Sequence, residues 1–300
     1  MARAMTQEPE VASKGTHLGG RPLSFYLHRL VLYVLVVALG TILLAPFILA
    51  ALGSFKADAE ILAYPPSLFP ETWRFENWVR VWNTDFGRGA TFPRWLFNTA
   101  FLSVTVAVLQ VIACSMAAYA FARLRFPGQE MVFNFMLGTM MIPGAVTLIP
   151  AFVLMSKLGL LNTYWSLILP GITSAGAIFI LTQFLKSIPR DLEEAAVIDG
   201  ASHFQIYKDV ILPLSRPALL TVFILQFQGM WNSFLQPLLY LTAPSMWVLN
   251  VALSVFRQQY QAQYNLVLVG AMFNAVPILV LFFFFSKYYI EGVAYAGLKG

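Results

Sequence analysis

Long apolar stretches separated by short polar segments form the main pattern along this chain. Six of these stretches can cross a membrane, because about 20 residues that each rise about 1.5 Å span about 30 Å of hydrocarbon. They are residues 31–52, 100–122, 132–155, 165–185, 218–241 and 266–285, and none carries Asp, Glu, Lys, Arg or His in its central portion. The pattern predicts an all-α integral membrane protein with six transmembrane helices.

The composition supports a membrane location. Hydrophobic residues make up 59% of the chain and charged residues 11%, whereas soluble domains have about 45–50% and about 25%. Attraction to anionic membrane lipid explains the net charge of +5, so no nucleic acid partner is required. The single cysteine, Cys114, falls within the second apolar stretch. We expect a small buried apolar side chain there and no intrachain disulfide.

The polar segments predict the orientation and the division of the chain. The first 25 residues contain no apolar core of a cleaved signal, so the N-terminus is expected to stay attached. Most Lys and Arg residues lie on the inner side if both termini and residues 186–216 are cytoplasmic, as the positive-inside rule favours. The expected parts are a cytoplasmic tail (1–29), a first transmembrane helix with a long external loop (30–99), a core of five transmembrane helices (100–286) and a cytoplasmic C-terminal tail (287–300).

Two features outside the polar loops have more than one interpretation. Proline and glycine interrupt or flank five spans, which suits either a bundle around a water-filled path or their ordinary frequency in membrane helices. In the external loop, Trp78 and Trp82 stand four residues apart, which predicts a short helix from Glu76 to Trp82. These tryptophans would anchor the loop at the membrane interface or contact an extracytoplasmic protein.

Residues 189–213 form the one long charged insert between apolar segments in the second half of the chain. Pro189 suits the first turn of a helix, and Asp191, Glu193 and Glu194 place negative charge near its positive amino-terminal end. Gly200 provides a turn that other residues would resist. The sequence predicts a first helix that ends at this glycine.

A second short helix is expected after the turn. Ser202 and Gln205 have the spacing of a capping box. Phe204, Tyr207 and Ile211 form an apolar edge on this helix. Pro213 is expected to end it, because Leu212 is biased away from helical geometry. Such a helix, turn and helix suits docking into a cleft of a partner, and the other interpretation is a segment lying flat on the membrane.

The motif E-A-A-V-I-D-G-A at residues 194–201 resembles the EAA loop of ABC importer permeases, and residues 189–213 are called the EAA segment below. V-I-L-P-L-S-R-P-A-L and the ending G-V-A-Y-A-G-L-K-G extend the resemblance, over residues 90–300, to the second permease subunit of maltose-type carbohydrate importers. The resemblance implies a MetI-like permease fold in a bacterial or archaeal cytoplasmic membrane. It also implies a heterodimer with a second permease, two ATP-binding subunits and an extracytoplasmic substrate-binding protein.

The resemblance assigns two sets of residues to contacts with the ATPase. The EAA segment contributes Glu194, Ala195, Ala196, Gly200, Phe204, Tyr207 and Pro213. The C-terminal tail contributes Gly297, Leu298, Lys299 and Gly300, for which a solvated end is the alternative.

Several kinds of chemistry have no support in the sequence. There is no P-loop motif, so ATP and Mg²⁺ are expected on partner subunits and no cofactor on this chain. The spans lack the ionisable relay of a proton-driven carrier. His17, His28 and His203 are far apart in sequence and no hydrolase or zinc-protease motif occurs. We therefore expect no catalytic residue, no metal site and no enzyme activity.

Polar residues within the spans are candidates for a translocation path. Gln228, Asn232 and Gln236 repeat every four residues and are expected on one face of the fifth helix. Asn274 and Gln183 are further candidates on the sixth and fourth spans. These amides would line the path or form hydrogen bonds between helices, because both arrangements give the same pattern.

The sequence thus predicts a permease subunit of an ATP-driven ABC importer, for an oligosaccharide or a disaccharide, that forms half of the path. An ATP-independent channel or facilitator and a membrane scaffold without transport activity are the alternatives.

Overall fold

The computed structural model describes residues 17–18, 21–260 and 263–297, with side chains over 25–260 and 263–284. The regular secondary structure of the described residues is helical, apart from one antiparallel pair of two-residue strands, β1 (His17–Leu18) and β2 (Arg21–Pro22). The prediction of an all-α membrane protein is confirmed.

The helices follow one another along the chain with short connections. The first half contains α1 (Leu23–Gly53), α2 (Asp58–Ile61), α3 (Glu76–Trp82), α4 (Phe92–Arg123), α5 (Gln129–Thr139), α6 (Gly144–Lys157), α7 (Trp165–Gly171) and α8 (Ala175–Ser187). The second half contains α9 (Asp191–Ile198), α10 (His203–Gln205), the π-helix η1 (Ile206–Ile211), α11 (Leu212–Leu214), α12 (Arg216–Trp231), α13 (Leu235–Tyr240), the 3₁₀-helix η2 (Pro244–Met246), α14 (Leu249–Gln259) and α15 (Tyr264–Gly297).

Among the described residues, four helical stretches are long and apolar enough to cross a membrane, namely Phe25–Gly53, Phe92–Arg123, Trp165–Ser187 and Tyr264–Phe284. Two further apolar pairs are sharply bent, α5 with α6 by 99° and His203–Leu214 with α12 by 77°. The third predicted span is therefore not one straight helix. Pro143 stands at its break with extended backbone, because proline cannot donate the hydrogen bond that would continue α5.

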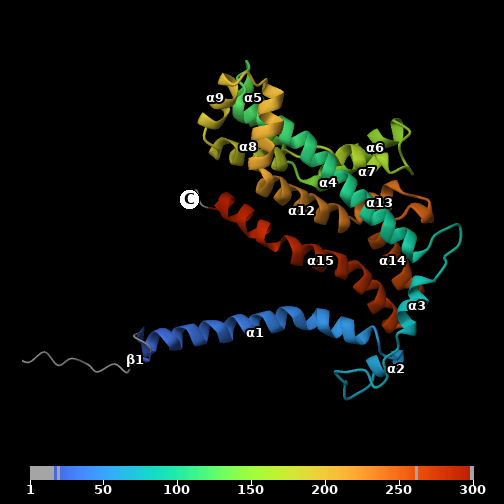
Figure 1. The fold of residues 1–300 in the computed structure, drawn as a ribbon. Helices are drawn as coiled ribbons and strands as arrows, with labels where there is room; N and C mark the ends of the chain where they lie inside the picture. The colour runs from blue at the N-terminus through green and yellow to red at the C-terminus, as the bar shows by residue number, and fades with distance from the viewer. Residues whose placement is uncertain (1–16, 19–20, 261–262, 298–300) are drawn as a thin grey trace, which may run out of the picture.

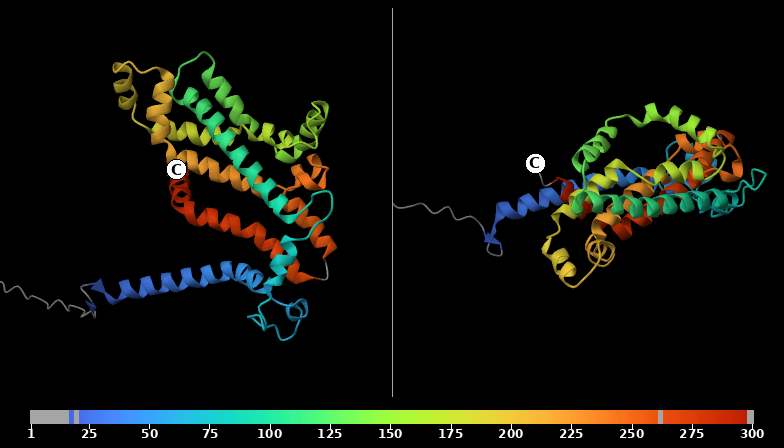
Figure 2. Two further views of the ribbon diagram at one scale, coloured as in Figure 1. Left: turned by 45° about the vertical axis from the view of Figure 1, so that its right-hand side comes forward. Right: turned by 90° about the horizontal axis from the view of Figure 1, so that it is seen from above.

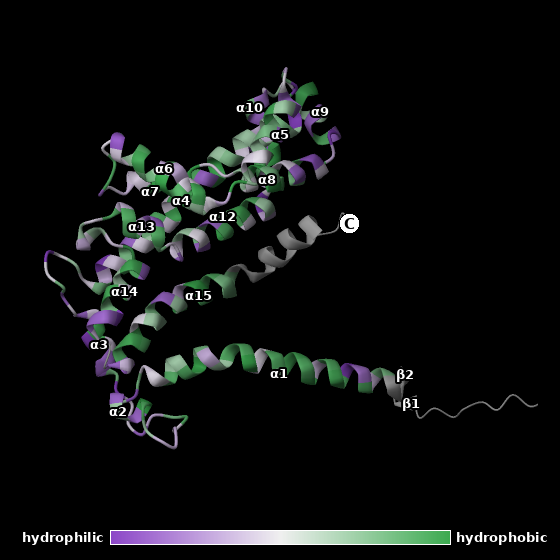
Figure 3. Cartoon of the chain, turned by 180° about the vertical axis from the view of Figure 1, so that it is seen from behind, coloured by the Kyte–Doolittle hydropathy of each residue, from purple (hydrophilic) through white to green (hydrophobic). Residues whose placement is uncertain are grey.

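The core surrounds α4, which packs against α12 and α8 (Figure 1). Buried residues of these three helices meet the EAA segment in one apolar cluster. α15 packs along α12 and contacts α1 near the C-terminal end of α1. Figures 1 and 2 show α1 as a separate arm beside this core. None of the residues in its apolar window is buried within the chain, and Figure 3 shows that most residues along α1 are hydrophobic.

The loop that follows α1 is held to the core by a network of amides. Asn77 Nδ2 donates to the backbone oxygens of Ser54 and Lys56 at 2.9 and 3.0 Å, and Asn265 Nδ2 contacts Asn77 Oδ1 at 3.3 Å. The predicted short helix from Glu76 to Trp82 is confirmed as α3.

Both tryptophans of α3 contact aromatic residues of the core, a role that neither interpretation of the sequence included. Trp78 stacks on Phe55 and meets Phe273 of α15 edge to face. Trp82 also contacts Phe273, although it stays partly exposed. The ring of Trp78 therefore helps to fix α3 on α15.

Candidate functional site

The EAA segment forms a compact helical hairpin at one end of the core (Figure 1). The first arm is α9, which begins after Pro189 with Asp191, Glu193 and Glu194 in its first turn. These carboxylates complement the positive end of the helix. The second arm runs through α10, η1 and α11, from His203 to Leu214. The predicted helix, turn and helix is confirmed.

Gly200 forms the turn with a φ of +82°. Its N–H donates to the Val197 carbonyl at 3.0 Å, and the N–H of Ala201 donates to the Ala196 carbonyl at 2.9 Å. These two bonds form a Schellman motif, in which the residue after the helix adopts the left-handed conformation that glycine tolerates best. The glycine thus fixes the direction in which the chain leaves α9.

The second arm starts with the predicted capping box. The backbone N–H of Ser202 donates to Gln205 Oε1 at 2.8 Å, while the backbone N–H of Gln205 donates to Ser202 Oγ at 3.4 Å. Each side chain thereby satisfies an N–H group that the first helical turn leaves without a partner. The connection between the two arms is therefore defined on both sides of Gly200.

The expectation that Pro213 ends the second arm is wrong. Leu212 has helical dihedrals, with φ −58° and ψ −46°, and the helix continues to Leu214. The preceding turns are π-helical, and this wider turn accommodates a proline ring that would clash in a regular α-helix. The break comes at Ser215, two residues before Pro217, which lies in the first turn of α12, where a proline is favourable.

α9 is joined to α4 by an ion pair. Arg123, the last residue of α4, places Nε 2.6 Å from Glu193 Oε1, and both side chains are largely buried. A second guanidinium nitrogen of Arg123 donates to the Ile188 carbonyl at 2.8 Å. Arg123 therefore binds both the first turn of α9 and Ile188, the residue that follows α8. Arg123 is not among the residues that the sequence pattern singled out, although an arginine at the end of an apolar span was an available signal.

The second arm is joined to α4 by Tyr207. Its hydroxyl lies 2.8 Å from Ser115 Oγ, and its ring packs 5.4 Å from the ring of Tyr119. Tyr207 is only 8% exposed. The structure therefore places this predicted contact residue inside the protein, where it faces α4.

Other residues of the EAA segment point away from the core. Ile198 is 86% exposed and Phe204 65% exposed, and Glu194, Ala195 and Pro213 are also exposed. Ala196 differs from Ala195, because it packs partly buried against the core cluster. We call the exposed set Glu194, Ala195, Ile198 and Phe204 the outer face of the hairpin. A small hollow of about 150 Å³, lined in part by Arg123 and Glu194, lies between the hairpin and the end of α4.

The three predicted path amides do not share one helix. α12 ends at Trp231, and Gln236 belongs to α13, so the expected stripe of Gln228, Asn232 and Gln236 on a single helical face is wrong. The Trp231 carbonyl accepts a hydrogen bond from Asn250 Nδ2 at 3.1 Å. Asn232 Nδ2 caps the same helix end by donating to the Gln228 carbonyl at 3.0 Å.

The remaining amides have different surroundings. Asn274 Oδ1 accepts a hydrogen bond from Trp231 Nε1 at 3.0 Å, so it connects α15 to α12. Gln236 and Gln183 are exposed on the surface of the chain. The amide pattern therefore contains at least one helix-to-helix contact and two exposed groups.

Two other predictions concern the C-terminal tail and the binding of metal ions. Leu298, Lys299 and Gly300 lie outside the described residues, and Gly297 ends α15. Within the described part, no group of three or more His, Cys, Asp or Glu residues could hold a metal ion.

Comparison with known proteins identifies the family. Residues 110–291 match the family model described as "Binding-protein-dependent transport system inner membrane component". This region contains the EAA segment and the packing of α8 and α12 around it. Members of this family are membrane components of transport systems. In such systems ATP is hydrolysed by separate subunits.

Several characterised relatives cover almost the whole chain. The arabinooligosaccharides transport system permease protein AraQ of Bacillus subtilis is 33% identical over 92% of this chain and 98% of its own length. The diacetylchitobiose uptake system permease protein NgcG of Streptomyces coelicolor is 33% identical over 85% of this chain and 84% of its own. The trehalose/maltose transport system permease protein MalG of Thermococcus litoralis is 31% identical over 91% of this chain and 98% of its own.

A solved structure supports the same placement. The chain is similar to a subunit in the crystal structure of a bacterial ABC transporter involved in the import of the acidic polysaccharide alginate. The TM-score is 0.77 at 25% identity, and the match covers 90% of this chain and 99% of that chain.

Proposed function

The chain belongs to the family of binding-protein-dependent transport system inner membrane components, and from this premise we propose that it is the permease subunit of an ATP-driven importer for an oligosaccharide or a disaccharide. Relatives named for arabino-oligosaccharides, diacetylchitobiose and trehalose or maltose support this class of substrate. The permease core of residues 100–286 would form half of the path. A second permease would form the other half, in a bacterial or archaeal cytoplasmic membrane with both termini in the cytoplasm.

The observation that carries the proposal is the two-sided construction of the EAA segment. Its outer face presents apolar and acidic side chains, with Ile198 and Phe204 exposed. Its inner side is fixed to α4 by the Arg123–Glu193 ion pair and the Tyr207–Ser115 hydrogen bond. A partner that binds the outer face would therefore move α4, which crosses the membrane and packs against α8 and α12.

We propose that two ATPase subunits supply this movement, one on each permease. Glu194 would pair with a basic group of the ATPase, Ala195 would permit close approach, and Phe204 would fill an apolar pocket. Gly200 would keep the angle between the two arms while the ATPase dimer closes on ATP. Tyr207, Ala196 and Arg123 would transmit the movement without touching the ATPase.

Two further assignments are part of the proposal. The C-terminal residues Gly297 to Gly300 would reach the interface between the ATPase subunits. Gln228, Asn232 and Gln236 would contribute polar groups at the outer end of α12 and in α13, and Asn274 would hold α15 to α12. The substrate-binding protein would deliver sugar to the external side of the core.

Purification of the complete complex tests the proposal. We expect this chain to co-purify in detergent with a second permease and an ATPase, and a sugar-loaded binding protein should raise the rate of ATP hydrolysis. A screen of sugars for this stimulation would name the substrate. Absence of any ATPase from the complex would instead support a channel or facilitator. If the ATPase responds to another solute and to no sugar, the proposed substrate class is wrong, but the assignment as an importer permease still holds.

A further inference from the structure

An open hollow with a volume of about 690 Å³ lies between the end of α4, the start of α5 and the last turn of α8. Its walls are formed by Phe121, Phe126, Gly128, Gln129, Glu130, Met131, Phe133 and Lys186. This volume falls in the usual range of ligand sites, about 300–1,000 Å³. None of these residues has a role in the function proposed above.

The connection between α4 and α5 gives the hollow a defined shape. Gly128 precedes α5 with a φ of +78°, and Gln129 Nε2 donates to the Phe121 carbonyl at 2.8 Å. The ring of Phe121 packs 5.8 Å from Phe126 and 5.2 Å from Phe133. The site is therefore built from ordered aromatic walls.

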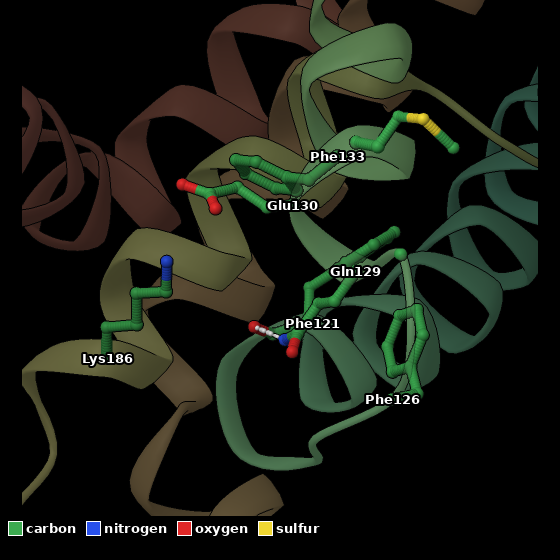
Figure 4. A pocket seen from close by; sticks show the side chains of 8 residues that line it. Phe121, Phe126, Gln129, Glu130, Phe133 and Lys186 are labelled. Atoms are coloured by element: carbon green, nitrogen blue, oxygen red, sulfur yellow. Dashed lines mark hydrogen bonds between the residues drawn. The ribbon is translucent and has the colours of Figure 1, made fainter.

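Two opposite charges stand at this aromatic wall. Lys186 Nζ lies 5.5 Å from the centre of the Phe133 ring, and Glu130 lines the same hollow. Figure 4 shows the Glu130 carboxylate and the Lys186 ammonium on the same side of the hollow. Among the described side chains, neither group forms an ion pair within 4.0 Å.

The hollow lies where membrane spans end. Phe121 is near the end of the span Phe92–Arg123, and Lys186 is near the end of the span Trp165–Ser187. Met131 and Phe135 on α5 are 73% and 78% exposed, so an apolar track leads away from the charged wall. Charged groups next to exposed apolar residues match the boundary between lipid headgroups and acyl chains.

We propose that this hollow binds a zwitterionic phospholipid with a primary ammonium headgroup, of the phosphatidylethanolamine type. Lys186 pairs with the phosphate, and the Glu130 carboxylate accepts hydrogen bonds from the ammonium N–H groups. An acyl chain lies along Met131 and Phe135. A phosphatidylglycerol headgroup would place the same phosphate at Lys186 but has no ammonium to balance the Glu130 carboxylate. A trimethylammonium headgroup has no N–H to donate to that carboxylate.

Lipid binding here would stabilise the junction of α5 with α8. Lys186 stands two residues before Ile188, whose carbonyl is bound by Arg123 of α4. The lipid would therefore lie next to the connection between the membrane core and the EAA hairpin.

Native mass spectrometry of the complete, delipidated complex tests the proposal with dioleoyl phosphatidylethanolamine, phosphatidylcholine and phosphatidylglycerol. We expect the ethanolamine lipid to be retained best. Glu130→Gln and Lys186→Ala should each reduce its retention about fivefold, since one partly exposed charged contact is lost. Lys157→Ala, an equivalent change at the end of α6, should leave retention unchanged.

Equal retention of the three lipids, or preference for the glycerol lipid, would overturn the proposal. So would unchanged retention in both hollow variants, or a complex in which another subunit fills the hollow and no lipid is retained. If Lys186→Ala fails to assemble, Glu130→Gln and the lipid preference of the unmodified complex still decide the question. The result does not depend on which solute is transported.

Discussion

The Tyr207 hydroxyl and Ser115 Oγ lie 2.8 Å apart in a buried hydrogen bond between the EAA hairpin and α4. The two residues are 92 positions apart in the sequence. Phe204, only three positions before Tyr207, is exposed. The two rings lie 6.2 Å apart, but Tyr207 is buried against α4 whereas Phe204 is exposed at the edge of the arm.

This contrast predicts different effects of two alanine substitutions. Tyr207→Ala should lower the stability of the complex by about 3 kcal/mol, because it removes a buried ring and its hydrogen bond. Phe204→Ala should leave thermal stability in detergent nearly unchanged and weaken binding of the ATPase. Thermal unfolding and co-purification measure the two effects. Equal loss of stability in both variants would contradict the orientation of this arm.

Arg123→Ala should also be strongly destabilising, by about 3 kcal/mol, because it leaves Glu193 partly buried without its partner. Glu193→Gln should cost less, since the amide can still accept a hydrogen bond from Arg123. A double-mutant cycle on thermal stability separates the coupling between the two residues from their individual effects. Additive effects would show that the pair does not hold α9.

Gly200→Ala should strain the turn by about 1 kcal/mol, because alanine disfavours the positive φ of this position. No other group lies within 4 Å of the added methyl group, so assembly should persist. We expect reduced uptake relative to ATP hydrolysis, measured in proteoliposomes. Gly89→Ala, in an open turn between α3 and α4 that also has positive φ, is the matched control and should retain coupling.

The polar residues near the end of α12 give a further test. Gln236→Leu should change uptake or sugar preference without loss of stability, because this side chain is exposed. Trp231→Phe should instead lower stability by about 1 kcal/mol, because it removes the hydrogen bond to Asn274. Transport assays and thermal unfolding distinguish a path residue from a helix contact. Normal transport by Gln236→Leu would remove Gln236 from the path.

Local signals in the sequence predicted the EAA hairpin well. The carboxylates at the start of α9, the left-handed Gly200 and the capping box of Ser202 and Gln205 all appear in the structure. Each depends on residues within one or two helical turns. Pro213 was misjudged, because the π-helical turns before it accommodate a proline that simple α-helical rules exclude.

The sequence by itself determined the membrane class, the apolar spans and the family, because hydrophobic length and a local motif require no knowledge of packing. Only the tertiary structure decided that Tyr207 faces inward, that Arg123 holds Glu193 and that α12 ends at Trp231. These features depend on partners such as Ser115 and Asn250, which are distant in sequence. A periodic pattern specifies which residues share a helical face, but the neighbouring helices determine where that face points and where the helix stops.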